Sequence, residues 1–286
     1  MYQTRDLDRI TKQIVSTIED ELLRIGLLFR IFSRVKSYES LNNKINRKGE
    51  GYYDGKVKFV NDIIGIRLIF YFSEDVNIIY DRLKEIFEFV DETVDKNEET
   101  KFAPTRINLI LKLKENSVKE FNDIVNHPKL APTFEVQLRT ILSEGWHEVD
   151  HDLRYKCQDD WEKNLDLARN FNGILAALET SEYAILSLFE QLSHRHYKSK
   201  NIEAMLRTKF RLRLASDRIS DELVKLLSDE IVKKIFKLDR MDFLTYLLNS
   251  EIFVPLTMDN LIYIINHRFV ENGEILKAMP NELMKS

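Results

Sequence analysis

The sequence predicts an α/β (α+β) fold, in which a section of mixed helices and strands is followed by a region made of helices alone. Three observations support this prediction. The first part of the chain has the three- and four-residue apolar spacing of amphipathic helices, and residues 63–139 contain the apolar runs and alternating segments of at least three strands. Between Gly173 and Gly273 the chain has no other glycine and a single proline, and its apolar spacing is helical. We therefore expect an α/β domain over residues 1–195 and a helical extension over residues 196–286.

Length and composition are those of an ordinary soluble protein. The 286 residues suit one large domain or one domain with a smaller companion, and 44% hydrophobic with 31% charged residues supply enough apolar material for a full core. The net charge of −4 gives no general attraction to nucleic acid or membranes, so any polyanion site has to be a local patch. A single cysteine, Cys157, excludes an internal disulfide and fits a reducing compartment. The N-terminus lacks an apolar signal core, and no apolar run approaches the roughly 18 residues that span a bilayer, so we expect a cytoplasmic protein without a membrane partner.

The first elements are two helices and a buried strand. The segment to about residue 30 has helical spacing, and a second helix is expected to begin after Ser37 as its N-cap. Residues 47–58 are charged and rich in glycine, which predicts a loop. Residues 63–72 form a continuous apolar run with β-branched and aromatic members, which predicts a buried strand. The apolar faces of the two helices are Ile10, Ile14, Ile18, Leu22 and Leu23 in the first, and Leu41 and Ile45 in the second.

Further helices and strands follow in alternation. Ser73 and two acidic residues begin a helix, residues 91–105 are polar and predict a loop, and residues 107–113 alternate as a strand does. A proline-bounded turn leads into a strand at Phe134, a helix follows it, and a long helix and several shorter ones lie beyond Trp161. The expected apolar stripes are Val76, Ile79, Tyr80, Leu83, Ile86, Phe87 and Val90 in the helix after Ser73, and Leu142, Trp146, Val149 and Leu153 in the helix after the last strand.

A first group of candidate site residues lies around the start of the second helix. Arg34 and Lys36 are two apart, so an extended backbone directs both to one side, whereas Ser40 and Lys44 are four apart and share a helix face. The four side chains converge on a helix N-terminus, whose free N–H groups favour phosphate. A solvated basic helix start would have the same pattern.

A second group surrounds the predicted buried strand. Asp62 at the mouth of this strand suits Mg²⁺, which prefers one or two carboxylates together with phosphate oxygens. Asp62 and Arg67 are an odd number apart and would point to opposite faces of a flat strand, unless Gly65 allows a bulge or Asp62 precedes the strand. Arg67 within an apolar strand needs a partner, because an unpaired buried charge is costly. A purely structural Asp–Arg pair is the alternative.

A third group follows from the last strand. Its apolar residues alternate with Glu135, Gln137 and Arg139, which places an acid, an amide and a guanidinium in one row. Such a row can hold a metal ion beside a polyanion, although a solvated edge strand would look similar. The helix after it carries a polar stripe that an ordinary exposed helix face also explains: Glu144, Glu148, His151 and Tyr155.

Taken in order, these three groups resemble the synthetase domain of the RelA/SpoT family, the alarmone (ppGpp) synthetases. The matching patterns cover about residues 30–160, and the ordered set is more specific than any single motif. The resemblance implies a mixed β-sheet of the nucleotidyltransferase-like kind, flanked by helices. The three motifs are Arg34-x-Lys36-x-x-x-Ser40-x-x-x-Lys44, Asp62-Ile63-x-Gly65-x-Arg67, and Glu135-x-Gln137-x-Arg139-Thr140 continued by Trp146-x-Glu148-x-x-His151-x-x-x-Tyr155-Lys156.

The resemblance also implies an activity and a role for each site residue. The reaction would be transfer of the β,γ-pyrophosphate of ATP to a ribose 3′-hydroxyl, as in the GTP pyrophosphokinases of the stringent response. Arg34 and Arg67 would stack on adenine, and Asp62 and Glu135 would bind Mg²⁺, with Glu135 also activating the hydroxyl. The phosphate ligands would be Lys36, Ser40 and Lys44, and the supporting residues would be Gln137, Arg139, Glu148, His151 and Tyr155.

One segment departs from the family pattern. The acceptor loop of the family reads Gly-Tyr-Arg-Ser-x-His, with the tyrosine stacked on guanine, whereas residues 103–108 here read Ala-Pro-Thr-Arg-Ile-Asn. The candidate acceptor residues are therefore Phe102, Arg106 and Asn108. The acceptor is expected to be GDP or GTP, giving (p)ppGpp, or another 3′-hydroxyl such as an adenine nucleotide or the tRNA 3′ end, as in toxin-like relatives.

A second class of function is a catalytically silent module that senses nucleotides or regulates a partner. Retention of both Asp62 and Glu135 argues against it, because nucleotide binding alone does not require that pair. The helical extension would serve as a homo-oligomer contact, as the site of a protein regulator or antitoxin, or as a structural addition.

Overall fold

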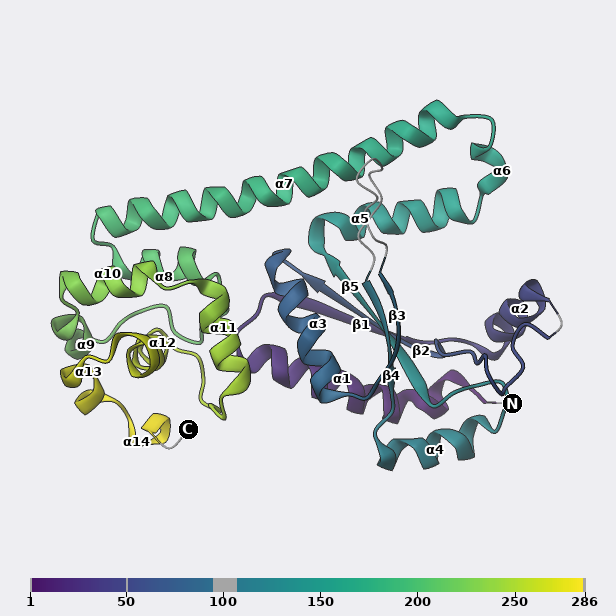
Figure 1. The fold of residues 1–286 in the computed structure, drawn as a ribbon, viewed down its shortest axis with the longest axis horizontal. Coiled ribbons are helices and arrows are strands. Elements are labelled where there is room, and N and C mark those ends of the chain that lie inside the picture. Colours follow the sequence, from purple (N-terminus) through teal and green to yellow (C-terminus); the bar gives the residue numbers. More distant parts are fainter. Residues whose placement is uncertain (1, 50, 95–106, 285–286) are drawn as a thin grey trace. The chain divides into compact units, whose positions relative to one another are not determined.

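The computed structural model divides into two compact units (Figure 1). Unit 1 comprises residues 1–19 and 29–180, and unit 2 comprises residues 20–28 and 181–286. Within the part of the chain that the structure describes, no helix is long and apolar enough to cross a membrane. The structure describes residues 2–49, 51–94 and 107–284.

Unit 1 is built on a five-stranded sheet in the order β1-β2-β5-β4-β3. The β2–β5 pair is parallel and the other pairs are antiparallel, so the predicted mixed sheet is confirmed. The parallel pair places the start of β2 beside the start of β5, and this juxtaposition brings the second and third sequence groups together. The strands are β1 (Phe29–Val35), β2 (Ile64–Phe70), β3 (Phe89–Val94), β4 (Ile107–Lys112) and β5 (Thr133–Thr140).

The two faces of the sheet differ in chemistry. Phe134, Val136 and Leu138 of β5 are almost completely buried on one face, and Phe134 contacts Phe87 at the end of helix α3, with ring centroids 5.0 Å apart. The residues that alternate with them along β1, β2 and β5 are mostly polar, apart from Phe32 and Ile69, and face the other side. Because alternate residues of paired strands share a face, the sheet has one dry face for the core and one polar face for a site.

The helices of unit 1 begin close to where the sequence predicts them. Helix α2 starts after Ser37, whose hydroxyl accepts a hydrogen bond from the Ser40 backbone N–H at 3.2 Å, as expected for an N-cap. The helical extension beyond the sheet is also confirmed. The helical elements of this unit are a 3₁₀ turn (Thr4–Leu7), α1 (Asp8–Arg24), α2 (Tyr38–Lys48), α3 (Glu74–Ile86), α4 (Glu115–Val125), α5 (Ile141–Asp150), a π-helical turn (His151–Tyr155), α6 (Gln158–Trp161) and α7 (Leu165–Lys198), of which α1 and α7 continue into unit 2.

The N-terminal helix is shorter than predicted. It ends at Arg24, and Gly26 takes a left-handed backbone with φ of 72°, so the chain reverses and continues as strand β1. The N–H groups of Gly26 and Leu27 bond to the carbonyls of Leu23 and Leu22, which is the Schellman pattern of a helix C-terminus. The prediction of helix to about residue 30 was therefore wrong.

Strand β3 replaces part of a predicted loop. Helix α3 ends at Ile86, and the polar segment that follows pairs with β4 at the edge of the sheet, so Val90 lies in a strand and not on the predicted helix stripe. An edge strand carries exposed polar side chains because only one of its sides is hydrogen-bonded. That environment overrides the low strand propensity of Asp91 and Glu92.

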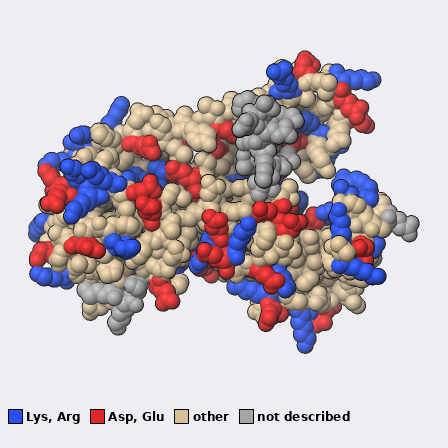
Figure 2. All heavy atoms as spheres, viewed as in Figure 1, with Lys and Arg blue, Asp and Glu red and all other residues tan. Residues whose placement is uncertain are grey.

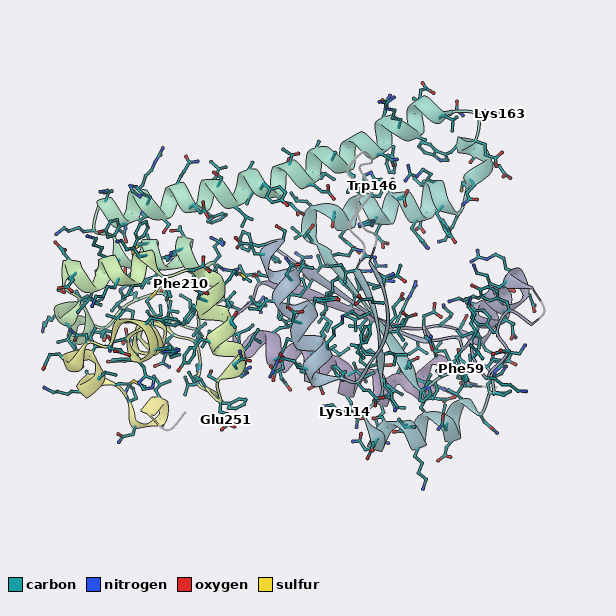
Figure 3. The ribbon with its side chains drawn as sticks, viewed as in Figure 1. Phe59, Lys114, Trp146, Lys163, Phe210 and Glu251 are labelled. Carbon is teal, nitrogen blue, oxygen red and sulfur yellow. The ribbon has the colours of Figure 1, made fainter. Side chains whose placement is uncertain are left out.

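The buried stripe of α5 differs from the predicted one. Trp146 is buried as expected, whereas Val149 and Leu153 are exposed and His147 and Asp150 are buried instead. The indole N–H of Trp146 donates to the Phe171 carbonyl of α7 at 2.9 Å, and the two rings stack 4.9 Å apart between α5 and α7 (Figure 3). Anchoring of α5 by this tryptophan turns its glutamates toward the sheet.

Unit 2 consists of helices, and Arg24 fixes the end of α1 to it. The Arg24 guanidinium donates to the carbonyls of Leu247 at 2.7 Å and Leu248 at 3.1 Å, which caps the C-terminus of α11. On the face drawn in Figure 2, the described lysines and arginines are interspersed with acidic residues. The remaining helices are α8 (Ile202–Phe210), α9 (Asp221–Leu226), α10 (Asp229–Lys237), α11 (Arg240–Asn249), α12 (Met258–Ile265), a π-helical turn (Asn266–Val270), α13 (Gly273–Ala278) and α14 (Asn281–Met284).

Candidate functional site

Asp62 forms the centre of the first two sequence groups. It lies two residues before β2, and the pairing of β2 with its neighbours continues through Gly65 without a shift, so the predicted alternative of a bulge is wrong. One carboxylate oxygen, Oδ2, accepts from the Lys36 ammonium at 2.5 Å and from the Lys44 ammonium at 2.7 Å. Lys36 follows β1 and Lys44 lies in α2, so the carboxylate ties these two elements together.

Burial and neighbouring charges shift the pKa values of this cluster in opposite directions. Burial alone would raise the pKa of Asp62, but the ammonium groups of Lys36 and Lys44 outweigh it and the pKa is lowered. Burial, together with the charges of Lys44 and Arg34, outweighs Asp62 and lowers the pKa of Lys36. The pKa of Lys44 is raised, because Asp62 and other nearby groups outweigh its burial. Asp62 is therefore held ionised in a partly buried position.

Glu135 lies on β5 beside Gly65 of β2, in the row that continues to Arg34 of β1. Burial, and then the negative charge of Asp62, raise the pKa of Glu135. The Gln137 side-chain amide donates to Glu135 Oε2 at 3.1 Å. Two carboxylates thus share one end of the sheet, with their pKa values shifted in opposite directions.

Arg67 links β2 to helix α5. Its Nε donates to Gln137 Oε1 at 3.2 Å, and its Nη1 donates to Glu144 Oε1 at 2.6 Å and to Glu148 Oε1. Because Arg67 binds the oxygen of the Gln137 amide, the amide nitrogen is directed at Glu135. The alternative of a structural Asp62–Arg67 pair is wrong, since the ion-pair partners of Arg67 lie in α5.

These residues line one cleft of about 510 Å³ on the polar face, which we call the first cleft. Gly65 leaves room in its floor, since the position of a Cβ there would be 3.7 Å from Arg34 Cγ and 3.8 Å from Arg34 Nε. Arg34 therefore extends over the strand that carries Gly65. The lining residues include Arg30, Phe32, Arg34, Asp62, Gly65, Arg67, Ile69, Glu135, Gln137, Ile141, Glu144 and Glu148.

A second cleft, of about 460 Å³, shares a wall with the first and opens toward the end of α5. Arg139 at its base is buried and donates to the carbonyl of Leu138 at 2.8 Å and to Asn108 Oδ1 at 3.1 Å. His151 and Tyr155 at its rim have near-parallel rings 6.0 Å apart. The structure thus places Asn108 with all five of the supporting residues, while Phe102 and Arg106 lie outside the described residues.

Not every predicted residue faces a cleft, and some lining residues were missed. Ser40 is exposed at the start of α2 and receives a hydrogen bond from the Ser37 hydroxyl at 2.9 Å. Arg30 and Phe32 line the first cleft but were assigned to the end of a helix or left unassigned. The alternation of Arg30 and Arg34 with Phe29, Ile31 and Val35 was the signal of a strand.

The carboxylates of the first cleft fit a divalent cation as a partial ligand set. Asp62 Oδ1 is buried and has no hydrogen-bond partner among the described residues, which leaves a lone carboxylate oxygen beside Glu135. Within the same described part of the chain, no three acidic, histidine or cysteine side chains group closely enough to hold a metal alone. Mg²⁺ suits such a site, because it is commonly bound by one or two carboxylates and completed by water and phosphate.

The segment that carries most of the site matches a known protein family. Residues 33–160 match the family model of the region found in RelA / SpoT proteins. The predicted resemblance is therefore confirmed for the segment that contains the lining residues of the second cleft and most of those of the first.

Individual relatives are similar to part of the chain. GTP pyrophosphokinase YwaC of Bacillus subtilis (strain 168) is 29% identical over 140 residues, which cover 46% of this chain and 61% of that protein. Small alarmone synthetase 1 from Bacillus subtilis aligns with a TM-score of 0.47 and 18% identity, over 64% of this chain and 94% of the other. The structure of that synthetase bound to its product pppGpp aligns with a TM-score of 0.47 and 19% identity, over 63% of this chain and 92% of the other.

Proposed function

We propose that this protein is a pyrophosphokinase that transfers the β,γ-pyrophosphate of ATP to the 3′-hydroxyl of a nucleotide. The observation that carries the proposal is the first cleft, in which Asp62, Arg67 and Glu135 come together on one polar sheet face inside the RelA/SpoT region. In this reaction the acceptor 3′-oxygen forms a bond to the β-phosphorus, and the bond from that phosphorus to the α,β-bridging oxygen breaks, so that AMP leaves.

The side chains of the first cleft, and the two lysines bound to Asp62, have distinct tasks in this proposal. Arg34 and Arg67 bind the adenine end of the donor, and Lys36 and Lys44 bind its phosphates. Glu135 takes the proton of the 3′-hydroxyl, a task suited to a carboxylate whose pKa is raised by burial and by Asp62. Mg²⁺, held by the two carboxylates when bound, would neutralise polyphosphate charge.

The second cleft is proposed to receive the acceptor, because it shares its wall with the first cleft and opens beside Glu135's neighbour Gln137. A guanine nucleotide is the first candidate, since the relative with the matching region is a GTP pyrophosphokinase. Adenine nucleotides and the tRNA 3′ end stay alternatives.

The test is a transfer assay with ATP labelled at the γ-phosphate, Mg²⁺, and one acceptor at a time: GDP, GTP, AMP, ADP, ATP or deacylated tRNA. We expect labelled product with one class of acceptor. Glu135→Gln should lower the rate by about a hundredfold or more, the usual contribution of a general base. Glu115→Gln, an exposed position in the first turn of α4, is the matched control and should retain full activity.

Two results would contradict the proposal. Equal transfer rates for the wild type and for Glu135→Gln would show that this carboxylate takes no part in the reaction. Absence of transfer to all of these acceptors, with ATP still bound, would instead support a silent nucleotide-sensing module.

A further inference from the structure

The lysine pair on Asp62 has a consequence for the order in which ligands enter the site. Lys36 and Lys44 reach the same oxygen, Oδ2, from two different elements, at 2.5 and 2.7 Å. All three side chains are largely shielded from solvent, with exposed fractions of 16%, 26% and 21% for Lys36, Lys44 and Asp62. The cluster as a whole carries one net positive charge.

This arrangement disfavours a divalent cation in the free protein. A cation at Asp62 would lie close to two ammonium groups, and charge repulsion at such a shielded position is much stronger than in bulk water. It would also find an incomplete ligand set, because the described residues offer two carboxylates in the cleft and no group of three metal-binding side chains. The remaining oxygens have to come from water or from the substrate.

A polyphosphate changes both conditions at once. Its oxygens give the ammonium groups of Lys36 and Lys44 new anionic partners, and they supply the further hard oxygen ligands that a divalent cation requires. Asp62 is then left with a free carboxylate beside Glu135.

We propose that Lys36 and Lys44 act as a latch on Asp62, which prevents this carboxylate from binding a divalent cation until a polyphosphate draws the two lysines away. The inference rests on the proposed function only in taking ATP as the polyphosphate. It assigns the lysines a second task besides phosphate binding, namely control over when Asp62 is available.

The experiment is a Mn²⁺ titration of the full chain without nucleotide, with binding measured by electron paramagnetic resonance. Mn²⁺ is chosen because it suits the same carboxylate and phosphate oxygens. The wild type should have no saturable site at Asp62. Lys44→Met and, separately, Lys36→Met should each gain Mn²⁺ affinity of about tenfold or more, because one competing ammonium is gone. The double variant Asp62→Asn with Lys44→Met should lose the gained site.

Lys48→Met is the matched control, because Lys48 lies one turn further along α2, is exposed and contacts the ring of Tyr52. This variant should bind Mn²⁺ as the wild type does. Adding a non-hydrolysable ATP analogue to the wild type should create a Mn²⁺ site that Asp62→Asn weakens. Thermal melts verify that each variant is folded.

Two outcomes would overturn the latch. One is a nucleotide-free Mn²⁺ site in the wild type that Asp62→Asn abolishes. The other is the absence of any gain in both folded lysine variants. The result is separable from the proposed function: transfer activity together with a nucleotide-free site would refute the latch alone, and a latch without transfer would refute the activity alone.

Discussion

The two clefts have five lining residues in common, yet their charged groups are held in different ways; the common residues are Arg34, Arg67, Gln137, Glu144 and Glu148. Around Asp62 in the first cleft the charges are shielded and bound to one another, and this carboxylate is only 21% exposed between two lysines. At the rim of the second cleft, His151 and Asp152 form a pair with 51% and 55% exposed side chains. Shielded charges depend on their partners for stability, whereas exposed charges have water as a substitute, so substitutions in the two clefts should differ in their structural cost.

The largest effect is expected at Asp62. Asp62→Ala leaves two partly buried ammonium groups without a partner, and we expect a loss of about 2–3 kcal/mol in unfolding free energy, somewhat below the cost for a fully buried pair. Urea denaturation measures this loss. Combining Asp62→Ala with Lys36→Met and Lys44→Met should recover part of the stability. If Asp62→Ala and the wild type were equally stable, the charges of Asp62 and its two lysines would be as well solvated as those at the rim of the second cleft.

Arg67 and its two glutamates test the shared wall. Arg67→Met removes the partner of Glu144, whose side chain is 15% exposed, and we expect a cost of roughly 1–2 kcal/mol from the stranded carboxylate. Glu148→Gln affects a carboxylate that is 53% exposed and should cost less than about 0.5 kcal/mol. Thermal unfolding of the two variants gives the comparison, and a reversed order would contradict the burial argument.

Glu135→Gln should abolish transfer and make the protein more stable. Because the folded-state pKa of Glu135 is raised, ionisation of this carboxylate lowers stability as the pH increases from its ordinary pKa through the raised one. At pH 7 the variant should gain about 0.5–1 kcal/mol, a common size for relief of a destabilised functional site. The gain should shrink at pH 4, where Glu135 is largely protonated. A constant gain at both pH values would exclude ionisation as its cause.

The contribution of Asp62 to stability changes with pH in the opposite direction. Its folded-state pKa is lowered, so its contribution to stability is present above its ordinary pKa and is lost as the pH falls through the lowered one. Comparing urea midpoints of the wild type and Asp62→Asn from pH 6 down to pH 3 should show the difference between them narrowing. A difference independent of pH would contradict this assignment.

The smallest structural effect is expected at the rim. His151→Ala should leave the unfolding midpoint unchanged, because its partners Asp152 and Tyr155 are exposed to water. If the second cleft takes the acceptor, the variant should raise the KM for the acceptor and leave the KM for ATP unchanged. A rise in the KM for ATP alone would show that the rim of the second cleft does not bind the acceptor.

Much of the site could be predicted because its motifs are local. Ser37 as an N-cap, the alternation of Glu135 and Gln137 with apolar residues, and the order of the three motifs follow from spacing along the chain. Spacing along the chain did not predict strands β1 and β3. Both are edge strands, and an edge strand takes its hydrogen bonds and its register from a neighbour elsewhere in the sequence. The apolar spacing before residue 30 resembles that of a helix, so it did not indicate that the chain leaves the helix at Gly26.

The sequence by itself determined the kinds of chemistry available here: two carboxylates, a lysine pair and several arginines. Only the tertiary structure decided the pairing, because Asp62 lies 18 residues from Lys44 and Arg67 lies 77 residues from Glu144. Charges choose partners by distance and burial in space, and neither is encoded in local periodicity. The parallel pairing of β2 with β5 brings Asp62 and Glu135 to one end of the sheet, and this topology turns separate motifs into one cleft.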